Sequence, residues 1–299
     1  MKELLTPRQV ARAIGASEAS LKRWCDKGLL PATRTAGGHR RLPLSGVLQF
    51  LRDRGQRLVR PEVLGLPSSS GKGEFTLEHA REAMRAALEG GDEERLLRLV
   101  FDLYLGGRQA CEILDGALAP ALHAVGERWQ HGETEVYEER RGIQVALAVL
   151  YRLVRSLPAP PDGAPLAVGG TLSGDPYTIP TLMAEICLRE SGWDARSFGT
   201  DLPADTMCTA LERLRPRLFW LSVSTWRSET DFLDSYGRVQ QKARELGVPV
   251  VVGGRALTDA VRRRMEYAAY CDTLRHLEAF ARTLLPKRAA AGRNPEGGP

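Results

Sequence analysis

The chain has 299 residues, of which 43% are hydrophobic and 26% are charged, and these values are typical of globular proteins. Because one domain usually holds about 100–200 residues, the length predicts two or more domains. No apolar run approaches the roughly 20 residues of a membrane span, and the N-terminal segment lacks the features of a secretory signal. We therefore expect a cytoplasmic protein without membrane contact. The five cysteines form no CxxC pair, which indicates reduced, packed thiols.

The net charge of +5 is unevenly distributed along the chain. Residues 1–60 hold thirteen Lys or Arg and four Asp or Glu, a net charge of +9, whereas the other 239 residues sum to −4. A small basic unit on a mildly acidic body is typical of proteins that bind a polyanion with one end through counterion release. A basic face that is simply solvated is the alternative interpretation.

Residues 1–60 carry the pattern of a helix-turn-helix followed by a basic hairpin. TPRQV opens a helix with Thr6 as N-cap and a Gln three residues later, which is a capping box, and Gly15 ends that helix. A second, basic helix begins at Ser17. Two short helices joined by a tight turn lay the second in the DNA major groove. The glycines of AGGHRRLPL permit a sharp wing whose arginines can bond phosphates.

The rest of the chain divides at two breaks. PEVLGLPSSSGKGEF (61–75) has no periodicity and predicts a linker, and proline-rich PAPPDGAP (158–165) predicts a stiff connector. Between them, residues 76–157 repeat Leu, Ala and Val at three- and four-residue spacings in four segments with glycines at the joints, which predicts a helical bundle. The tail 286–299 has almost no apolar content and is expected to be disordered.

Residues 166–285 have a different period. The short apolar or β-branched runs LAVGGTL, WDARSFG, RLFWLSVST and VPVVVGG alternate with helix-like stretches. This alternation is typical of βαβ units and predicts a doubly wound parallel sheet, whose ligands lie beyond the carboxyl ends of the strands. The expected fold class is therefore multidomain, α followed by α/β.

The head is similar to a known family of DNA-binding domains. Over about residues 4–55 the sequence resembles the winged helix of the MerR superfamily, and WCDKGLLPATRTAGGHRR carries the most specific part of the pattern. The resemblance implies DNA contacts from the basic residues of the second helix and the wing, which are Lys22, Arg23, Arg34, His39, Arg40 and Arg41. A basic helix in a protein-binding module is the alternative. A metal site at His39 has no second ligand near it in sequence.

Beyond the head, the chain resembles the light-sensing, adenosylcobalamin-dependent repressors of the same superfamily, which are called CarH-like or LitR-like. In those proteins a four-helix bundle caps the upper face of the corrin, and a flavodoxin-like domain holds the lower face and the nucleotide tail. The order of head, bundle and α/β domain matches over nearly the whole chain. The resemblance thus implies a four-helix bundle at 76–157 and a flavodoxin-like sensor domain at 166–285.

Two motifs of that family are altered in this sequence. The bundle motif Trp-x9-Glu-His is present as Trp129, Glu139 and then Arg140, and the loop motif Glu/Asp-x-His-x-x-Gly is present as DPYTIP, with Tyr177 at the His position. Arg and Tyr therefore stand where the family has imidazoles that bind cobalt. Neither is a comparable donor, so we do not expect a His-ligated cobalamin.

The positions that the resemblance assigns to the nucleotide tail are better kept. SVST supplies two hydroxyl groups, and VVVGGRAL ends a strand in two glycines, which allow close backbone approach to a ligand. Doubly wound domains without a ligand also carry Ser and Gly at such turns. The complete set of expected ligand contacts is Trp129, Glu139, Arg140, Tyr177, Ser222, Ser224, Gly253 and Gly254.

Three interpretations of the sensor remain open. It binds another tetrapyrrole, such as a bilin or haem, whose propionates suit Arg140, Arg141 or Arg255; or it is a ligand-free domain that only dimerises; or it binds cobalamin without a protein imidazole. For each candidate ligand side chain, the alternative is a purely structural role, either packed in the core or solvated on the surface. The candidate haem ligands and bilin attachment points are His123, His131, Cys187 and Cys208.

The sequence as a whole predicts a transcription regulator, with repression favoured, that binds double-stranded operator DNA as a homo-oligomer, either a dimer or a tetramer. Light or a chromophore would act by changing how bundle and α/β domain pack. A cobalamin-type enzyme component is the alternative from a different class. It is disfavoured because the sequence shows no coordinating His and no Ser/His/Asp or Cys/His constellation.

Overall fold

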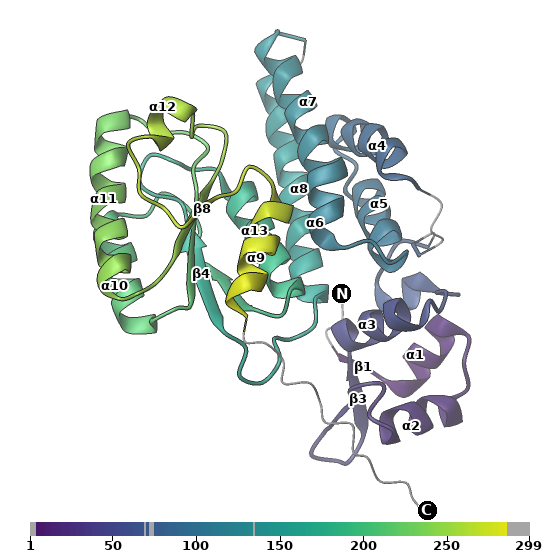
Figure 1. The fold of residues 1–299 in the computed structure, drawn as a ribbon. Helices are drawn as coiled ribbons and strands as arrows, with labels where there is room; N and C mark the ends of the chain where they lie inside the picture. The colour runs from purple at the N-terminus through teal and green to yellow at the C-terminus, as the bar shows by residue number, and fades with distance from the viewer. Residues whose placement is uncertain (1–3, 69, 72–74, 134, 286–299) are drawn as a thin grey trace, which may run out of the picture.

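Three units follow one another along the chain: a small head, a helical bundle and an α/β domain (Figure 1). This arrangement is that of a computed structural model, which describes residues 4–68, 70–71, 75–133 and 135–285. The expected fold class is confirmed. The segment 286–299, which we predicted to be disordered, lies outside the described residues.

The head is a winged helix-turn-helix. The capping box forms as predicted, because the Gln9 amide nitrogen donates to Thr6 Oγ1 at 3.2 Å and the Thr6 amide nitrogen donates to Gln9 Oε1 at 2.9 Å. Gly15, with φ of +67°, ends the first helix, and Gly38, with φ of +77°, lies in the turn of the wing. The elements are β1 (Leu4–Leu5), α1 (Pro7–Ile14), α2 (Glu18–Asp26), β2 (Thr33–Arg34), β3 (Arg40–Pro43) and α3 (Leu44–Arg54).

The bundle is built from the four periodic segments that the sequence predicted. One of them is a composite helix in which a π-helical turn interrupts the α-helix, and this turn comes just before Pro120, whose ring cannot donate a backbone hydrogen bond. The elements are α4 (Leu77–Gly90), α5 (Glu93–Leu105), α6 (Ala110–Ile113), the π turn (Leu114–Leu118), α7 (Ala119–Gln130) and α8 (Val136–Ser156).

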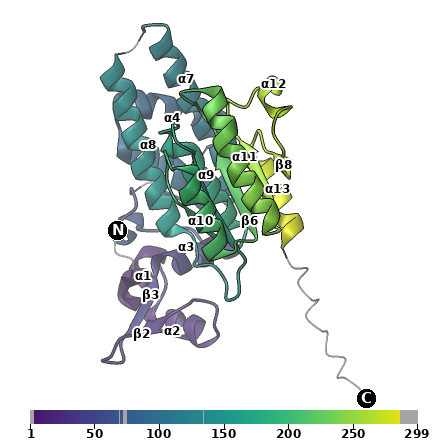
Figure 2. The same ribbon diagram turned by 90° about the vertical axis from the view of Figure 1, so that its left-hand side faces the viewer.

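The C-terminal unit is a five-stranded parallel sheet in the order β5-β4-β6-β7-β8, which is the flavodoxin-like order. Helices α9 and α13 cover one face and α10 and α11 the other (Figures 1 and 2). The sequence did not predict β8. The strands are β4 (Leu166–Gly170), β5 (Asp194–Ser197), β6 (Leu218–Ser222), β7 (Val250–Gly253) and β8 (Ala269–Tyr270). The helices are α9 (Thr178–Glu190), α10 (Ala204–Leu214), α11 (Glu229–Glu245), α12 (Asp259–Arg262) and α13 (Leu274–Leu284).

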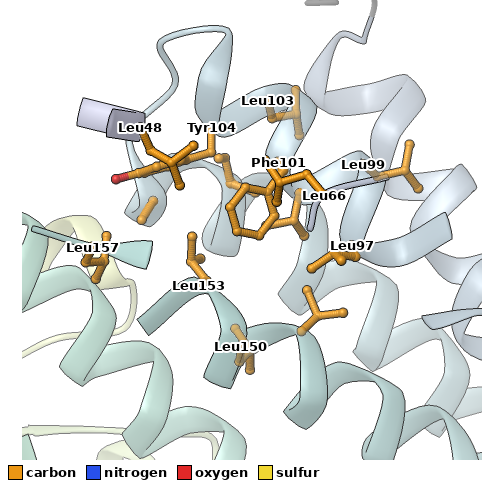
Figure 3. Packing of buried hydrophobic residues seen from close by; sticks show 14 of the residues in the cluster. Leu48, Leu66, Leu97, Leu99, Phe101, Leu103, Tyr104, Leu150, Leu153 and Leu157 are labelled. Atoms are coloured by element: carbon orange, nitrogen blue, oxygen red, sulfur yellow. The ribbon is translucent and has the colours of Figure 1, made fainter. Parts of the chain in front are cut away.

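The head is docked on the bundle through a shared hydrophobic core. Helix α3 packs against α5 and α8, and Figure 3 shows Leu48 of α3 beside Tyr104 of α5. The segment 61–75, which we predicted to be a linker, is packed where it is described: Pro61–Leu64 forms a 3-10 helix, and Leu64 and Leu66 are buried. The segment buries only two leucines close together, which is too few to produce a recognisable periodicity. The sequence alone therefore predicted a linker.

The same core continues into the α/β domain. Four residues on α9 belong to it, and α9 packs against α6 and α8. The three units therefore form one body with contacts at both boundaries. Among the described residues, no helix combines the length and the apolar character that crossing a membrane requires. The α9 residues are Ile179, Leu182, Met183 and Ile186.

Candidate nucleic-acid interface and sensor site

The basic surface of the head lies on α2 and the wing, at the end of the head farthest from the bundle (Figure 1). Lys22, Arg23, Arg34 and His39 are exposed there, whereas Arg40 is half-buried. The α2 helix buries Leu21 on its inner side, so its two basic residues point away from the core. This is the arrangement in which a recognition helix enters the major groove while the wing approaches the backbone.

Arg40 braces the wing against α2. Its Nη2 donates to Asp26 Oδ1 at 2.5 Å and its Nη1 donates to the Lys22 carbonyl oxygen at 3.3 Å. Asp26 is half exposed, so the ion pair itself contributes about 1 kcal/mol or less. Arg41 is also half-buried, with its Nη1 3.3 Å from the Arg40 carbonyl oxygen. In the DNA-free protein, Arg40 thus fixes the angle between wing and helix.

At the carboxyl edge of the sheet, Asp175 fastens two loops together. Its Oδ2 accepts a hydrogen bond from the Ser224 amide at 2.6 Å, and its Oδ1 accepts one from the Tyr177 amide at 3.1 Å. Burial raises the pKa of Asp175, and the backbone donors oppose that rise. These loops follow β4 and β6, where the strand order reverses, so Asp175 sits at the topological switch point.

Tyr177 and Arg255 form the exposed rim of this edge. Tyr177 is 39% exposed, and the guanidinium carbon of Arg255 lies 5.4 Å from its ring centroid. The Arg255 Nε is 3.4 Å from the Ser224 carbonyl oxygen, and Arg255 forms no ion pair with any residue that the structure describes. The rim therefore presents an aromatic ring and an exposed cation, whose charge opposes the rise in the pKa of the buried Asp175 carboxylate.

The two serines and two glycines predicted to contact a ligand are tightly packed at this edge. Ser222 and Ser224 are each only 8% exposed. A Cβ on Gly253 would lie 2.4 Å from the Cys271 carbonyl oxygen, and one on Gly254, whose φ is +124°, would lie 2.2 Å from the Val223 carbonyl oxygen. Both glycines are thus required by the close approach of neighbouring backbone, and their contact with a ligand stays a prediction.

The bundle residues lie around the turn between α7 and α8, at the tip farthest from the head (Figure 1). Trp129 is 42% exposed. The Arg140 side chain is 71% exposed, and its Nε is 3.5 Å from Oε2 of the half-buried Glu139. Arg141 is used within the bundle instead, because its Nη2 donates to the Glu89 carbonyl oxygen at 2.7 Å. Both arginines are exposed, but Arg141 is held by this hydrogen bond to α4, whereas Arg140 contacts its neighbour Glu139.

Sequence reasoning missed two apolar side chains beside Trp129. Val136 and Tyr137, in the first turn of α8, are 52% and 65% exposed. Their position directly after the α7–α8 turn was the available signal. Together the three residues make an exposed apolar tip.

The thiols proposed for bilin attachment are unsuited to it. Cys187 is 1% exposed, and a hydrogen bond to Cys111 together with burial raises its pKa well above the usual value. Burial also raises the pKa of Cys208, whose Sγ lies 3.7 Å from the Arg238 carbonyl oxygen. Thiols with raised pKa are poor nucleophiles.

Three histidines differ in their surroundings: two are the candidate haem ligands, and the third was not singled out in the sequence. His123 and His131 are exposed on α7 and at its end, whereas His276 lies in the first turn of α13, directly after β8, with its Nδ1 paired to Asp272. The sequence analysis did not single out His276, although the four-residue Asp-to-His spacing was visible. Among the described residues, no cluster of three His, Cys, Asp or Glu could hold a metal ion.

Comparison with known proteins identifies the class of each part. A helix-turn-helix domain model matches residues 4–55, and a B12 binding domain model matches residues 80–153. The fold thus joins a helix-turn-helix head to a bundle of the kind found in B12 binding domains.

Individual relatives agree with this division. The chain is 35% identical over 177 residues to the HTH-type transcriptional repressor CarH of Myxococcus xanthus, covering 59% of this chain and 58% of that relative. It is 23% identical over 186 residues to the dimethylamine corrinoid protein of Methanosarcina barkeri, covering 60% of this chain and 85% of that one.

A solved structure supports the fold of the bundle and the α/β domain. The monomethylamine corrinoid protein of Methanosarcina barkeri matches with a TM-score of 0.59 at 15% identity, covering 70% of this chain and 100% of that one. At this identity the likeness shows the fold alone.

The residues present do not fit a corrinoid held through a protein imidazole. The motif resemblance predicts Tyr177 and Arg140 at the two positions concerned, and neither side chain offers a neutral nitrogen donor to cobalt. Both side chains are exposed and fixed by contacts of their own, Tyr177 with Arg255 and Arg140 with Glu139. No step of the function is therefore assigned to cobalt.

Proposed function

We propose that the protein is a sequence-specific DNA-binding transcription regulator, acting as a repressor, whose bundle and α/β domain form its sensor. The observation that carries this proposal is the exposed basic surface of α2 and the wing on a head docked to a B12-type bundle. The likeness to a protein named as a transcriptional repressor supports it. The corrinoid relatives share the fold of the sensor part, and we propose a regulatory rather than a catalytic role for it.

In this proposal Lys22 and Arg23 on α2 contact the major groove, and the wing residues contact phosphates. Arg40 holds the wing at its angle through Asp26. Two heads related by the symmetry of a homo-oligomer would read two half-sites. Changes in the packing of bundle against α/β domain would change the spacing of the heads, and so the affinity for the operator.

The proposal is tested by selecting duplexes from a random pool with the intact chain and titrating the selected duplex at several salt concentrations. We expect the logarithm of the association constant to fall with the logarithm of salt concentration, by about 0.9 per phosphate contact. An affinity that does not change with salt would contradict the proposal. Loss of the preference for the selected duplex in a chain lacking residues 1–60 is the second expected result.

We further propose that the sensor binds a tetrapyrrole other than His-ligated cobalamin and responds to it or to light. The support is chemical: the rim offers an aromatic face at Tyr177 and an exposed cation at Arg255, and the α7–α8 tip of the bundle offers the exposed ring of Trp129. Aromatic rings would stack on a planar π system, and Arg255 would bind an anionic side group such as a propionate.

An absorption spectrum of the purified intact chain, recorded in darkness and after illumination, tests the ligand. We expect a visible band of bilin or haem type that weakens in Arg255→Gln and is kept in Arg213→Gln, a control on the same domain. A corrin spectrum would favour cobalamin bound without an imidazole. A colourless protein after expression with both pigments would favour a ligand-free, dimerising domain.

A further inference from the structure

One arginine of the head contacts both other units. Arg52, in the last turn of α3, donates from Nη1 to Glu190 Oε1 on α9 at 2.7 Å and from Nη2 to the Arg108 carbonyl oxygen at 3.0 Å. Its guanidinium carbon lies 3.8 Å from the ring centroid of Tyr104 on α5. A single side chain thus joins the head to the bundle and to the α/β domain.

Glu190 completes the connection with its second oxygen. Its Oε2 accepts a hydrogen bond from the Ala110 amide at 2.5 Å. Ala110 is the first residue of α6, and an amide at that position has no partner within its own helix. Glu190 therefore ties α9 to α6, while Arg52 ties α3 to Glu190.

The junction is more buried than most ion pairs of this protein. The side chains of Arg52 and Glu190 are 12% and 17% exposed, and Tyr104 is 1% exposed. By comparison, the pair of Arg244 with Glu266 has side chains 67% and 73% exposed. Removing one partner of a buried pair leaves an uncompensated charge and costs far more than breaking a solvated pair.

One carboxylate joins the head, the bundle and the α/β domain. Each oxygen of Glu190 serves a different unit, and the planar guanidinium fits Glu190 and the Tyr104 face in one orientation only. A shift of α9 against α6 by the length of a hydrogen bond separates Glu190 from Ala110 or from Arg52. Packed interfaces of this kind respond by switching between arrangements rather than by deforming gradually.

We propose that Arg52, Glu190 and Tyr104 form a coupling junction through which the packing of bundle against α/β domain sets the position of the head. Arg52 and Glu190 are positioning residues in this role, because they would not touch DNA or a sensor ligand. The consequence for DNA binding rests on the proposed function, whereas the mechanical coupling does not.

The Ala110 amide reports the junction directly. Because Glu190 is the hydrogen-bond acceptor of this buried amide, its hydrogen-exchange rate in the intact chain reports how often the junction opens. We expect Arg52→Met, a change in the head, to raise that rate in the bundle about tenfold. Arg52→Lys, which keeps the charge without the planar fork, should give a smaller rise.

Two matched variants separate coupling from general destabilisation. Arg54→Met removes a cation from the same turn of α3, where Arg54 lies over Phe50 of the head itself. Glu185→Gln changes a carboxylate on α9 that binds Arg189 and the Ser197 amide within its own domain. Neither should change the Ala110 rate more than about twofold. An unchanged rate in both Arg52→Met and Arg52→Lys, or an equal rise in Arg54→Met, would overturn the proposal.

A second measurement tests the link to DNA. In the wild-type chain, the duplex selected by the head should change the Ala110 exchange rate, and in Arg52→Met the same duplex, still bound, should leave it unchanged. A response that persists in Arg52→Met would overturn the role of the junction. Failure to select any duplex would instead refute the proposed function, and the DNA-free exchange data would still stand.

Discussion

The head and the carboxyl edge of the sheet differ in how their chemistry relates to their fold. In the head, a capping box, a glycine turn and a buried Leu21 build α1, α2 and the wing, and four of the six basic residues expected to contact DNA stand exposed on that frame. At the sheet edge, Asp175, Gly253 and Gly254 build the loops, and the exposed Tyr177 beside Arg255 is the side chain that the loops present to solvent. In the head the frame and the exposed basic side chains are both visible in the sequence, whereas at the sheet edge the structure shows the frame and leaves the ligand a prediction.

The largest expected effect concerns the core that joins head and bundle. Leu48→Ala removes a fully buried side chain of α3 and should lower the free energy of unfolding by about 2–5 kcal/mol. Calorimetry should still show the head and bundle unfolding together. Leu29→Ala, at a position 42% exposed, should cost about 0.5 kcal/mol or less. A separate early transition for the wild-type head would show that the two units are not one body.

At the sheet edge, Gly254→Ala should destabilise the α/β domain by about 3 kcal/mol, because its Cβ would collide with the Val223 carbonyl oxygen. Gly247→Ala is the matched control, since it also has a positive φ but open space around it, and it should cost about 1 kcal/mol. Denaturant melts compare them. If the Gly254→Ala protein kept its stability and lost only ligand binding, Gly254 would be a ligand-contact residue and the packing account would be wrong.

In the head, charge reversal should act on binding and leave stability intact. Lys22→Glu with Arg23→Glu should weaken binding to the selected duplex about 100-fold, because attraction to phosphates and bases becomes repulsion. Reversal of Arg238 and Arg244, which are exposed on α11 of the sensor, is the control. Equal losses in the two proteins, measured by fluorescence anisotropy, would mean that net charge alone drives binding.

The smallest expected effect is a loss of stability at alkaline pH that depends on Tyr104. Burial raises the pKa of Tyr104 to about 12, above the value near 10 of an unfolded tyrosine. Its stabilising contribution is therefore complete below about pH 10 and is lost as pH rises toward 12, by about 1.4 kcal/mol at pH 11. Tyr104→Phe, which cannot ionise, should reduce the fall in the free energy of unfolding between pH 10 and pH 12. An unchanged slope would contradict the burial of the hydroxyl group.

The fold was largely predictable because its signals are local. Capping, helical periodicity and the alternation of apolar runs located α1, α2, the bundle helices and four of the five strands. Strand β8 has two residues, too few to show a period. The packed turn at Leu64 and Leu66 escaped notice for the same reason.

The site was predictable only in part, because its geometry depends on partners far apart in sequence. The motif located Arg40, but its pairing with Asp26 across the wing requires the folded head. Asp175 was visible in DPYTIP, yet its bond to Ser224 spans 49 residues. Arg52 carried no local signal at all, since its partner Glu190 lies 138 residues away.

The central claim is that the head reads DNA by sequence. The most direct test is the ratio of affinities of the intact chain for its selected duplex and for random-sequence duplex, measured in competition at physiological salt. We predict a ratio of about 1,000 or more, falling sharply when Lys22 and Arg23 are replaced by alanine. A ratio near one in the wild-type chain would contradict the account.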